Sequence, residues 1–259
     1  MDMMYDEFSS DYDRFVNWSN RLAVELPFIE QQLQQAGAQR VLDAACGTGK
    51  HAIALAQKGY AVVGADLSTG MIEQARANAA AARAQAPFFV AGFGELSTQV
   101  GGGFDALLCL GNSLPHVLTP ADLSAALGDF AACLRPGGLL LVQNRNFDAV
   151  LARGERWMEP QPYRLGDKEW LFLRFYDFEP DGLLSFHVLT LRRQGGGEWS
   201  QRVTSTRLWP QRRDELLTAI ETAGFVDITC YGDMQGHPYD TGNSGNLVVT
   251  ARRGLAQQL

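Results

Sequence analysis

One acidic, glycine-bearing turn carries the residues best suited to chemistry. The stretch Val41-Leu-Asp-Ala-Ala-Cys-Gly-Thr-Gly49 runs from an apolar strand into a helix, and Asp66 ends the next strand, 17 residues after Gly49. Glycines at such a turn let the backbone approach a ligand closely, and an acid ending the second strand can accept hydrogen bonds from ribose hydroxyls. Together these features predict an adenosine-containing cofactor at the carboxyl edge of a parallel sheet.

Two details of the turn decide between cofactors. The run Gly47-Thr-Gly49-Lys-His-Ala52 lacks the third glycine of the dinucleotide pattern G-x-G-x-x-G. Asp43 ends the first strand, where a carboxylate would repel a pyrophosphate but attract an ammonium or sulfonium group. The turn therefore favours S-adenosyl-L-methionine (SAM), with S-adenosyl-L-homocysteine (SAH) as product. The alternative, a bare strand-to-helix turn with incidental glycines, is disfavoured by Asp66 in register.

Alternating strands and helices must position this turn. The expected strands are 40–44, 61–65, 87–91, 104–110 and 139–143, and the expected helices are 50–58, 69–84 and 120–134. Thr119 is expected to cap the last helix, and the Arg-Pro-Gly-Gly run at 135–138 to end it. This alternation predicts right-handed βαβ crossovers and a parallel sheet covered on both faces.

The pattern changes after Arg145. Three β-like segments, joined by Glu-Pro-Asp-Gly and Gly-Gly-Gly turn signals, predict an inserted antiparallel meander; they are 169–178, 182–193 and 198–209. A helix at 211–223 and strands at 225–231 and 246–252 then complete the chain. The first 35 residues predict one or two helices with an aromatic stripe of Tyr5, Phe8, Tyr12, Phe15 and Trp18. Such a stripe is more often core packing than a cofactor lid.

Composition excludes several classes of protein. The net charge is -7 without a Lys/Arg cluster, so a dedicated nucleic-acid binder is disfavoured. No apolar run approaches the roughly 18 residues of a membrane span, and the acidic start does not resemble a secretory signal. The four cysteines lack metal-ligand spacing and predict reduced thiols in a cytoplasmic protein. We expect no metal, and a small-molecule substrate.

The glycine-bearing turn resembles motif I of the class I SAM-dependent methyltransferases. The resemblance covers about residues 36–145 and 210–253, and it implies an α/β, Rossmann-like, seven-stranded, mostly parallel sheet with a reversed last strand. It implies that Asp43 and Gly47 lie near the methionine moiety and that Asp66 binds the ribose. The commonest motif I has glycine where this chain has Ala45.

Further stretches resemble the glycine N-methyltransferase group. They are Gly103-Phe-Asp-Ala-Leu-Leu-Cys-Leu-Gly-Asn-Ser-Leu-Pro-His116, Leu134-Arg-Pro-Gly-Gly-Leu-Leu-Leu141, Asn144-Arg-Asn-Phe-Asp148, Gly224-Phe225 and Tyr231-Gly-Asp-Met234. The meander takes the place of that group's substrate-covering insertion. The resemblance implies four parts: a helical lid segment (1–35), a SAM-binding core (36–146), the β insertion (147–209) and a core completion (210–259). It also makes self-association into a homo-oligomer conceivable.

The resemblance assigns roles residue by residue. At the methyl-transfer site it places Leu110, Asn112 and His116, with Arg145 on the substrate carboxylate. Tyr163 is a counterpart of a family tyrosine, and His187 stands where another tyrosine is expected, which argues that the acceptor differs from glycine itself. The cofactor set comprises Tyr12, Trp18, Arg21, Asp43, Ala45, Gly47, Gly49, Asp66, Leu67, Met71, Gly92, Phe93 and Leu110. Phe93 would stack on adenine, and Arg21 would pair with the cofactor carboxylate.

Physical arguments leave some of these roles open. Arg145 follows the fifth strand, so its guanidinium opens to the crevice and suits a carboxylate; the alternative is a solvated surface arginine. His116 is either a general base or positioning donor, or an ordinary structural histidine. His51 and His237 are expected at the surface.

The resulting hypothesis is methyl transfer from SAM to the nitrogen of a small amino acid or amine of the glycine and sarcosine type. The enzyme would supply orientation and desolvation, without an assigned general base. Four alternatives stay open: an O-methyltransferase of a small metabolite or natural product, a silent SAM-binding protein, a nucleobase methyltransferase and a NAD-dependent oxidoreductase. The nucleobase class is disfavoured because strand four ends in Leu-Gly-Asn-Ser. The sequence does not identify the acceptor or the number of methyl groups transferred.

Overall fold

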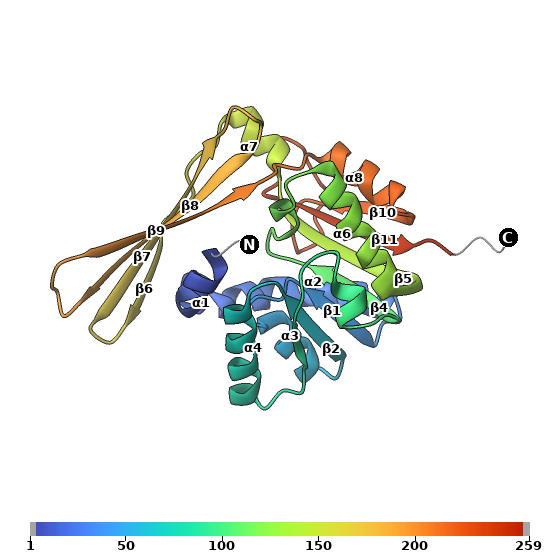
Figure 1. Ribbon diagram of the computed structural model, residues 1–259, viewed down its shortest axis with the longest axis horizontal. Coiled ribbons are helices and arrows are strands. Elements are labelled where there is room, and N and C mark those ends of the chain that lie inside the picture. The colour runs from blue at the N-terminus through green and yellow to red at the C-terminus, as the bar shows by residue number, and fades with distance from the viewer. Residues whose placement is uncertain (1–3, 256–259) are drawn as a thin grey trace.

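The computed structural model describes residues 4–255, and within the first helix it describes the side chains of Asp6, Ser9 and the residues from Asp11 onward. The side chains of Tyr5 and Phe8, the first members of the expected aromatic stripe, lie outside this description. A seven-stranded sheet with its helices forms one side of the molecule, and a long four-stranded sheet forms the other (Figure 1).

The seven-stranded sheet has the order β10-β11-β5-β4-β1-β2-β3. Its strands are β1 (Arg40–Ala44), β2 (Ala61–Asp66), β3 (Phe88–Val90), β4 (Phe104–Cys109), β5 (Leu134–Arg145), β10 (Phe225–Tyr231) and β11 (Asn246–Arg253). The five strands β1 to β5 run parallel, and β11 runs antiparallel to both β5 and β10. The predicted α/β class, with its reversed last strand, is confirmed.

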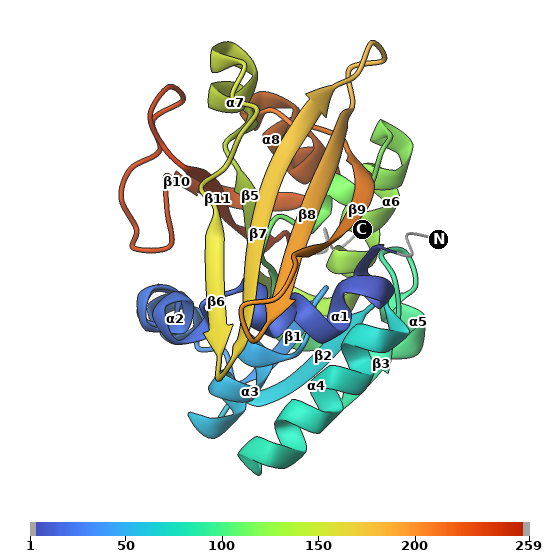
Figure 2. The same ribbon diagram turned by 90° about the vertical axis from the view of Figure 1, so that its left-hand side faces the viewer.

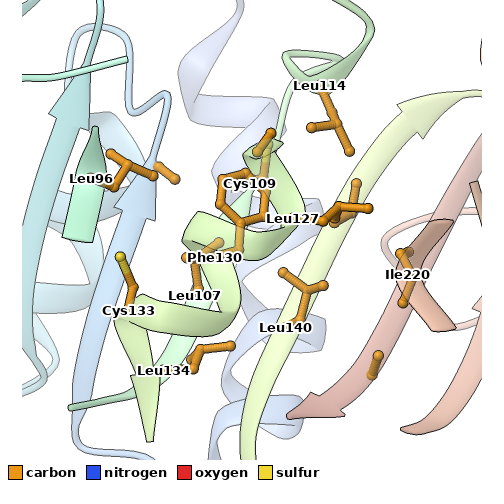
Figure 3. Packing of buried hydrophobic residues seen from close by; sticks show 14 of the residues in the cluster. Leu96, Leu107, Cys109, Leu114, Leu127, Phe130, Cys133, Leu134, Leu140 and Ile220 are labelled. Carbon is orange, nitrogen blue, oxygen red and sulfur yellow. The ribbon is translucent and has the colours of Figure 1, made fainter. Parts of the chain in front are cut away.

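Helices cover both faces of this sheet. One face packs against α2 (Trp18–Gln35), α3 (Lys50–Gln57) and α4 (Thr69–Ala82), and the other against α5 (Leu96–Gln99), α6 (Pro120–Cys133) and α8 (Arg213–Thr222). Figure 3 shows Leu127, Phe130 and Cys133 of α6 among the buried side chains of β4 and β5. Side chains of a strand alternate between the two clusters, because successive residues point to opposite faces.

The inserted antiparallel sheet is also confirmed, with one strand more than expected. Its order is β6-β7-β8-β9, and the strands are β6 (Gln161–Leu165), β7 (Lys168–Phe178), β8 (Leu184–Gln194) and β9 (Ser200–Leu208). The short, polar β6 contains Pro162 and gives almost no strand signal, but it gains its hydrogen bonds from β7. The insertion begins with α7 (Phe147–Arg153), which the sequence did not predict.

Element boundaries differ from prediction mainly at β5. The expected strand began at residue 139, whereas β5 begins at Leu134 and pairs with Phe104 before its register shifts. Helix α6 ends at Cys133, one residue before the expected end, and the run at 135–138 expected to stop it lies in β5. The Thr119 side chain accepts a hydrogen bond from the Asp122 N–H at the start of the helix, as expected. A 3-10 helix, η1 (Leu114–His116), follows β4.

The N-terminal helix α1 (Met4–Phe15) lies between α4 and the four-stranded sheet, close to β6 and β9 (Figures 1 and 2). It therefore contacts both halves of the molecule. Within residues 4–255 every helix is too short or too polar to cross a membrane. The cysteines are free thiols, and all except Cys230 are buried, as expected.

Candidate active site

A cavity of about 390 Å³ opens between the carboxyl ends of β4 and β5, the α1–α2 junction and the four-stranded sheet. Five of the predicted site residues line it, although they come from distant parts of the sequence: Tyr12, Arg21, Asn112, His116 and Arg145. The parallel sheet explains the convergence of Asn112, His116 and Arg145, because strand ends and the loops that follow them meet at one edge. Tyr12 and Arg21 reach the same cavity from α1 and α2.

Three residues of the glycine-bearing turn adopt left-handed backbone conformations. Ala45, Gly47 and Gly49 have φ angles of 59°, 54° and 77°, in the left-handed region. A Cβ on Gly49 would lie 2.8 Å from the Phe88 ring, whereas one on Gly47 would lie 3.7 Å from the Tyr12 ring. Gly49 is therefore required by packing as well as by φ, and Tyr12 covers the turn at Gly47.

Asp66 fixes the turn from the end of β2. Its Oδ2 accepts a hydrogen bond from the Gly47 N–H at 2.8 Å, and its Oδ1 accepts one from the Ser68 N–H at 2.9 Å. Burial raises the pKa of Asp66, and these two hydrogen bonds oppose that rise. Asp66 stands at the position where an acid would meet ribose hydroxyls.

Asp43 is buried, with 2% of its surface exposed, and its Oδ2 has no hydrogen-bond partner among the described residues. Burial, together with the negative charge of Asp66, raises the pKa of Asp43 to about 7. An unpartnered carboxylate oxygen beside the glycine turn suits a positively charged ligand, because the charge would stabilise the ionised carboxylate. The residues present therefore fit SAM, whose methionine part carries a sulfonium and an ammonium group.

The adenine side of the predicted cofactor set is less enclosed. Leu67 is 50% exposed, and its side chain would contact a Cβ placed on Gly92. Phe93 packs edge-on against Phe130 of α6, with ring centroids 5.2 Å apart. Met71, near the start of α4, is buried, with 2% of its surface exposed.

Asp13 of α1 ties the N-terminal helix to the glycine turn. Its Oδ1 accepts hydrogen bonds from the Thr48 hydroxyl at 2.6 Å and from the Trp18 indole at 3.0 Å. Its Oδ2 pairs with Lys50 at 3.0 Å and accepts a hydrogen bond from Asn78 of α4. This explains why Tyr12, one residue earlier, lies over the turn.

A buried polar network that sequence reasoning missed holds Arg21. The Nε of Arg21 donates to both oxygens of Glu25 at 3.1 Å, and Glu25 Oε2 lies 2.7 Å from His51 Nε2. Gln143 closes the network through Arg21 and Glu25. His51 is thus buried, and the expectation that it lies at the surface is wrong. The Arg21 guanidinium, predicted to bind the cofactor carboxylate, already has one carboxylate partner.

Asn112 and Arg145 are joined directly. Asn112 follows β4 with a φ of 66°, and its Oδ1 accepts a hydrogen bond from the Arg145 N–H at 2.8 Å. The Arg145 guanidinium pairs with Glu155 at 2.5 Å, while its buried Nε has no hydrogen-bond partner among residues 4–255. The next residue, Asn146, donates to the carbonyl oxygens of 240, 241 and 244, which anchors the loop between β10 and β11.

Leu110 and His116 flank Asn112 along the chain. Leu110 is buried, and its carbonyl oxygen accepts a hydrogen bond from the Ser113 hydroxyl at 2.8 Å. His116 ends η1 and lines the cavity. The loop after β4 therefore presents a carbonyl, an amide and an imidazole at one edge of the sheet.

Tyr163 and His187, the two site residues predicted in the insertion, lie on opposite faces of the four-stranded sheet. Tyr163 lies on the inner face of the four-stranded sheet, edge-on to Trp170, beyond the residues that line the cavity. His187 lies on the outer face, where it stacks on Phe175 and bonds to Ser205 and Asp177. The structure does not bring His187 to the cavity. The residues of the insertion that line it are Met158, Gln161, Arg174, Tyr176, Phe186, Val188 and Leu208.

Comparisons with known proteins identify the family. A family model described as a methyltransferase domain matches residues 41–138. A glycine/sarcosine N-methyltransferase of Aphanothece halophytica is 32% identical over 229 residues, which are 88% of this chain and 82% of that protein. One of Parasynechococcus marenigrum is 36% identical over 234 residues, 89% of this chain and 78% of that protein. This chain belongs to the glycine/sarcosine N-methyltransferase family.

The fold agrees with this family assignment. An S-adenosylmethionine-dependent methyltransferase of Clostridium acetobutylicum superposes with a TM-score of 0.77 at 16% identity, covering 97% of this chain and 99% of that one. The chain is therefore a SAM-dependent methyltransferase with a Rossmann-like core and acts on a small molecule. Within the described residues, no group of three His, Cys, Asp or Glu side chains is placed to hold a metal ion.

Proposed function

We propose that this enzyme methylates the amino nitrogen of a small α-amino acid of the glycine and sarcosine class. The observation that carries the proposal is the hydrogen bond between Asn112 and the Arg145 backbone, which fixes an amide beside a carboxylate-binding guanidinium in one cavity. An α-amino acid presents an amine and a carboxylate that these two side chains could bind together. The relatives named above act on glycine and sarcosine according to their names.

The mechanism follows from what each side of the cavity offers. SAM supplies an electrophilic methyl group on its sulfonium. The acceptor amine must present a free lone pair, so it reacts in its neutral form. In this proposal the Leu110 carbonyl oxygen, which accepts one hydrogen bond from Ser113, would accept an N–H of that amine with its second lone pair, and Asn112 would orient the amine from the other side. Arg145 binds the carboxylate, so that the nitrogen faces the methyl donor.

The apolar part of the cavity excludes water. Met158, Phe186, Val188 and Leu208 of the insertion lie along its wall. Removing water from the amine strengthens its interactions with the polar groups of the loop after β4, and it prevents hydrolysis of the donor. His116 is proposed as a positioning donor in this scheme, and no side chain is assigned as an obligate base.

Other features proposed from the sequence accompany this function. We retain the four-part division of the chain at 35/36, 146/147 and 209/210. We also retain a cytoplasmic location, the absence of a nucleic-acid substrate, and self-association. In the cofactor site, Tyr12, Asp43, Gly47 and Asp66 are the residues whose positions support a SAM-binding role most directly.

A transfer assay tests the proposal. Labelled SAM is offered with glycine, sarcosine, N,N-dimethylglycine, other amino acids and small amines, and product masses are recorded. We expect one or more methyl groups on an amino-acid nitrogen. Arg145→Ala should lower kcat/KM at least about 100-fold, because a charge-assisted carboxylate contact is lost. Arg207→Ala, which removes a surface ion pair with Asp181, is the control.

Two results would contradict the proposal. Transfer only to acceptors without a carboxylate, with Arg145→Ala neutral, would indicate an O-methyltransferase or another small-molecule methyltransferase. SAM binding without transfer to any acceptor would indicate a silent SAM-binding protein.

A further inference from the structure

A second guanidinium faces the cavity from the inserted sheet. Arg174 lies on β7, directly opposite Val188 of β8, and two residues from Tyr176; all three line the cavity. The Phe15 ring of α1 lies under the guanidinium, 4.9 Å from centroid to carbon. Arg174 is thus fixed on the wall that faces the loop after β4.

Arg174 differs from the other two arginines that line the cavity because it has no carboxylate partner among residues 4–255. Arg21 pairs with Glu25, and Arg145 pairs with Glu155. Arg174 forms no ion pair with a carboxylate in the described part of the chain, and its buried Nε has no hydrogen-bond partner. Burial is the largest cause that lowers the pKa of Arg174, and the positive charge of Arg145 adds to it.

A half-buried guanidinium without a counter-ion is costly unless a ligand supplies one. The groups that face Arg174 are the Phe15 ring, the phenols of Tyr176 and Tyr12 and the charged Arg145. None of them carries negative charge at neutral pH, because burial raises the pKa of both tyrosines. Glu155 already neutralises Arg145. The positive charge left over in the cavity is therefore that of Arg174, and an anion of the acceptor is its natural partner.

We propose that Arg174 is a second carboxylate-binding residue, which acts with Arg145 to select α-amino acids over uncharged amines of the same size. This inference rests on the proposed function. Arg145 would bind the carboxylate through the part of its fork that Glu155 leaves open, and Arg174 would bind it from the opposite wall. A guanidinium group is planar and has several N–H donors, so two arginines can bind the same carboxylate from different sides.

A purely structural role for Arg174, holding Phe15 and α1 in place, predicts a different outcome. Loss of that stacking would disturb the α1 contact with the glycine turn, so SAM binding would weaken. It would affect every acceptor alike, whether or not the acceptor carries a carboxylate.

The test compares acids with their amides. Steady-state kinetics are measured with glycine and glycinamide, and with sarcosine and its amide, for the wild type, Arg174→Gln and Arg174→Lys. We expect Arg174→Gln to raise the KM for the acids about 10- to 100-fold, with the KM for SAM and for the amides unchanged. Arg174→Lys should recover part of the loss. Arg164→Gln, on exposed β6, is the control.

Equal changes for acid and amide, or a change confined to SAM, would overturn the inference. The proposed function can fail separately, if the wild type methylates no amino acid. In that case, calorimetry with SAH-saturated protein tests whether Arg174 binds an anion, with acetate and glycine as carboxylate probes. Weaker binding of both probes to Arg174→Gln than to the wild type supports the anion site, and unchanged or absent binding overturns it.

Discussion

The two sides of the proposed active site are built by different means. The proposed donor side, which comprises Asp43, the turn at 45–49 and Asp66 and is not among the residues that line the cavity, is shaped by backbone conformation and by hydrogen bonds to backbone N–H groups. The acceptor side, which comprises Asn112, Arg145 and the lining residues of the insertion, is shaped by side chains from separate sheets. A backbone-built site tolerates little change, whereas a side-chain-built site can change its specificity by substitution. This difference suits one donor shared by many methyltransferases and an acceptor that varies among them.

Gly49→Ala should have the largest effect, and it tests whether SAM binding requires the backbone conformation of the glycine turn. The new Cβ would lie 2.8 Å from Phe88 at a φ of 77°. We expect the free energy of unfolding to fall by about 3–5 kcal/mol from strain and overpacking together, and SAM binding to be lost. Gly59→Ala is the control, because φ is 95° there and no atom lies within 4 Å. Denaturant unfolding should show a loss of only about 1–2 kcal/mol for that variant.

Asp43→Asn tests the electrostatic part of the donor side. The pKa of Asp43 is raised to about 7, so the folded protein holds a proton that the unfolded chain releases near pH 4. Its contribution to stability is therefore present below about pH 4 and is lost as the pH rises through about 7. Denaturant unfolding of the ligand-free protein at several pH values should show this decline in the wild type, and a flatter profile in Asp43→Asn.

The same variant should weaken SAM binding about 100-fold at pH 8, because the ionised carboxylate faces a cationic ligand. Calorimetry measures this affinity. If Asp43→Asn binds SAM as tightly as the wild type, then Asp43 does not contribute charge to the donor side.

Asp13→Ala tests whether α1 belongs to the donor side. This substitution removes the contacts with Thr48, Trp18, Lys50 and Asn78, so the helix should hold the turn less firmly. We expect about 10-fold weaker SAM binding, measured by calorimetry. Asp11→Ala removes only an ion pair with Arg14 inside α1 and should change the affinity less than 2-fold, about the effect of an exposed pair.

His187→Ala should have the smallest effect. The imidazole lies on the outer face of the inserted sheet, so kcat/KM should change less than about 2-fold, as for a surface substitution. Phe186→Ala, one position along β8 on the inner face, should lower kcat/KM clearly because it removes part of the apolar wall. A large loss in His187→Ala alone would contradict the separation of the two faces.

The glycine turn and the position of Asp66 at the end of β2 were predictable from the sequence because their signals are local. A glycine turn after an apolar strand and an acid at the end of the next strand lie within one βαβ unit, whose handedness and sheet edge are fixed by general rules. The position of Arg145 at the sheet edge was predictable for the same reason, since it ends a parallel strand, whereas Asn112 was assigned from the family resemblance.

The acceptor wall was less predictable because it depends on register. Whether Arg174 or His187 faces the cavity is decided by the pairing of β7 with β8, and a shift of one residue would exchange the two faces. The pair of Glu25 and His51 was missed for a related reason. The two residues are 26 positions apart, on α2 and α3, and only the packing of these helices on the sheet brings them together.

The pairing of β5 with β11 has a consequence for the order in which the protein is completed during synthesis. Arg145 is opposite Asn246, and Asn146 holds the carbonyl groups of 240 to 244, so the arginine gains its final position only after the last strand has emerged from the ribosome. At typical translation rates of about 5–20 residues per second, the nascent chain has β1 to β4 available several seconds before β11. During that interval, the half that binds the methyl donor can fold while the half that chooses the acceptor is still unfinished.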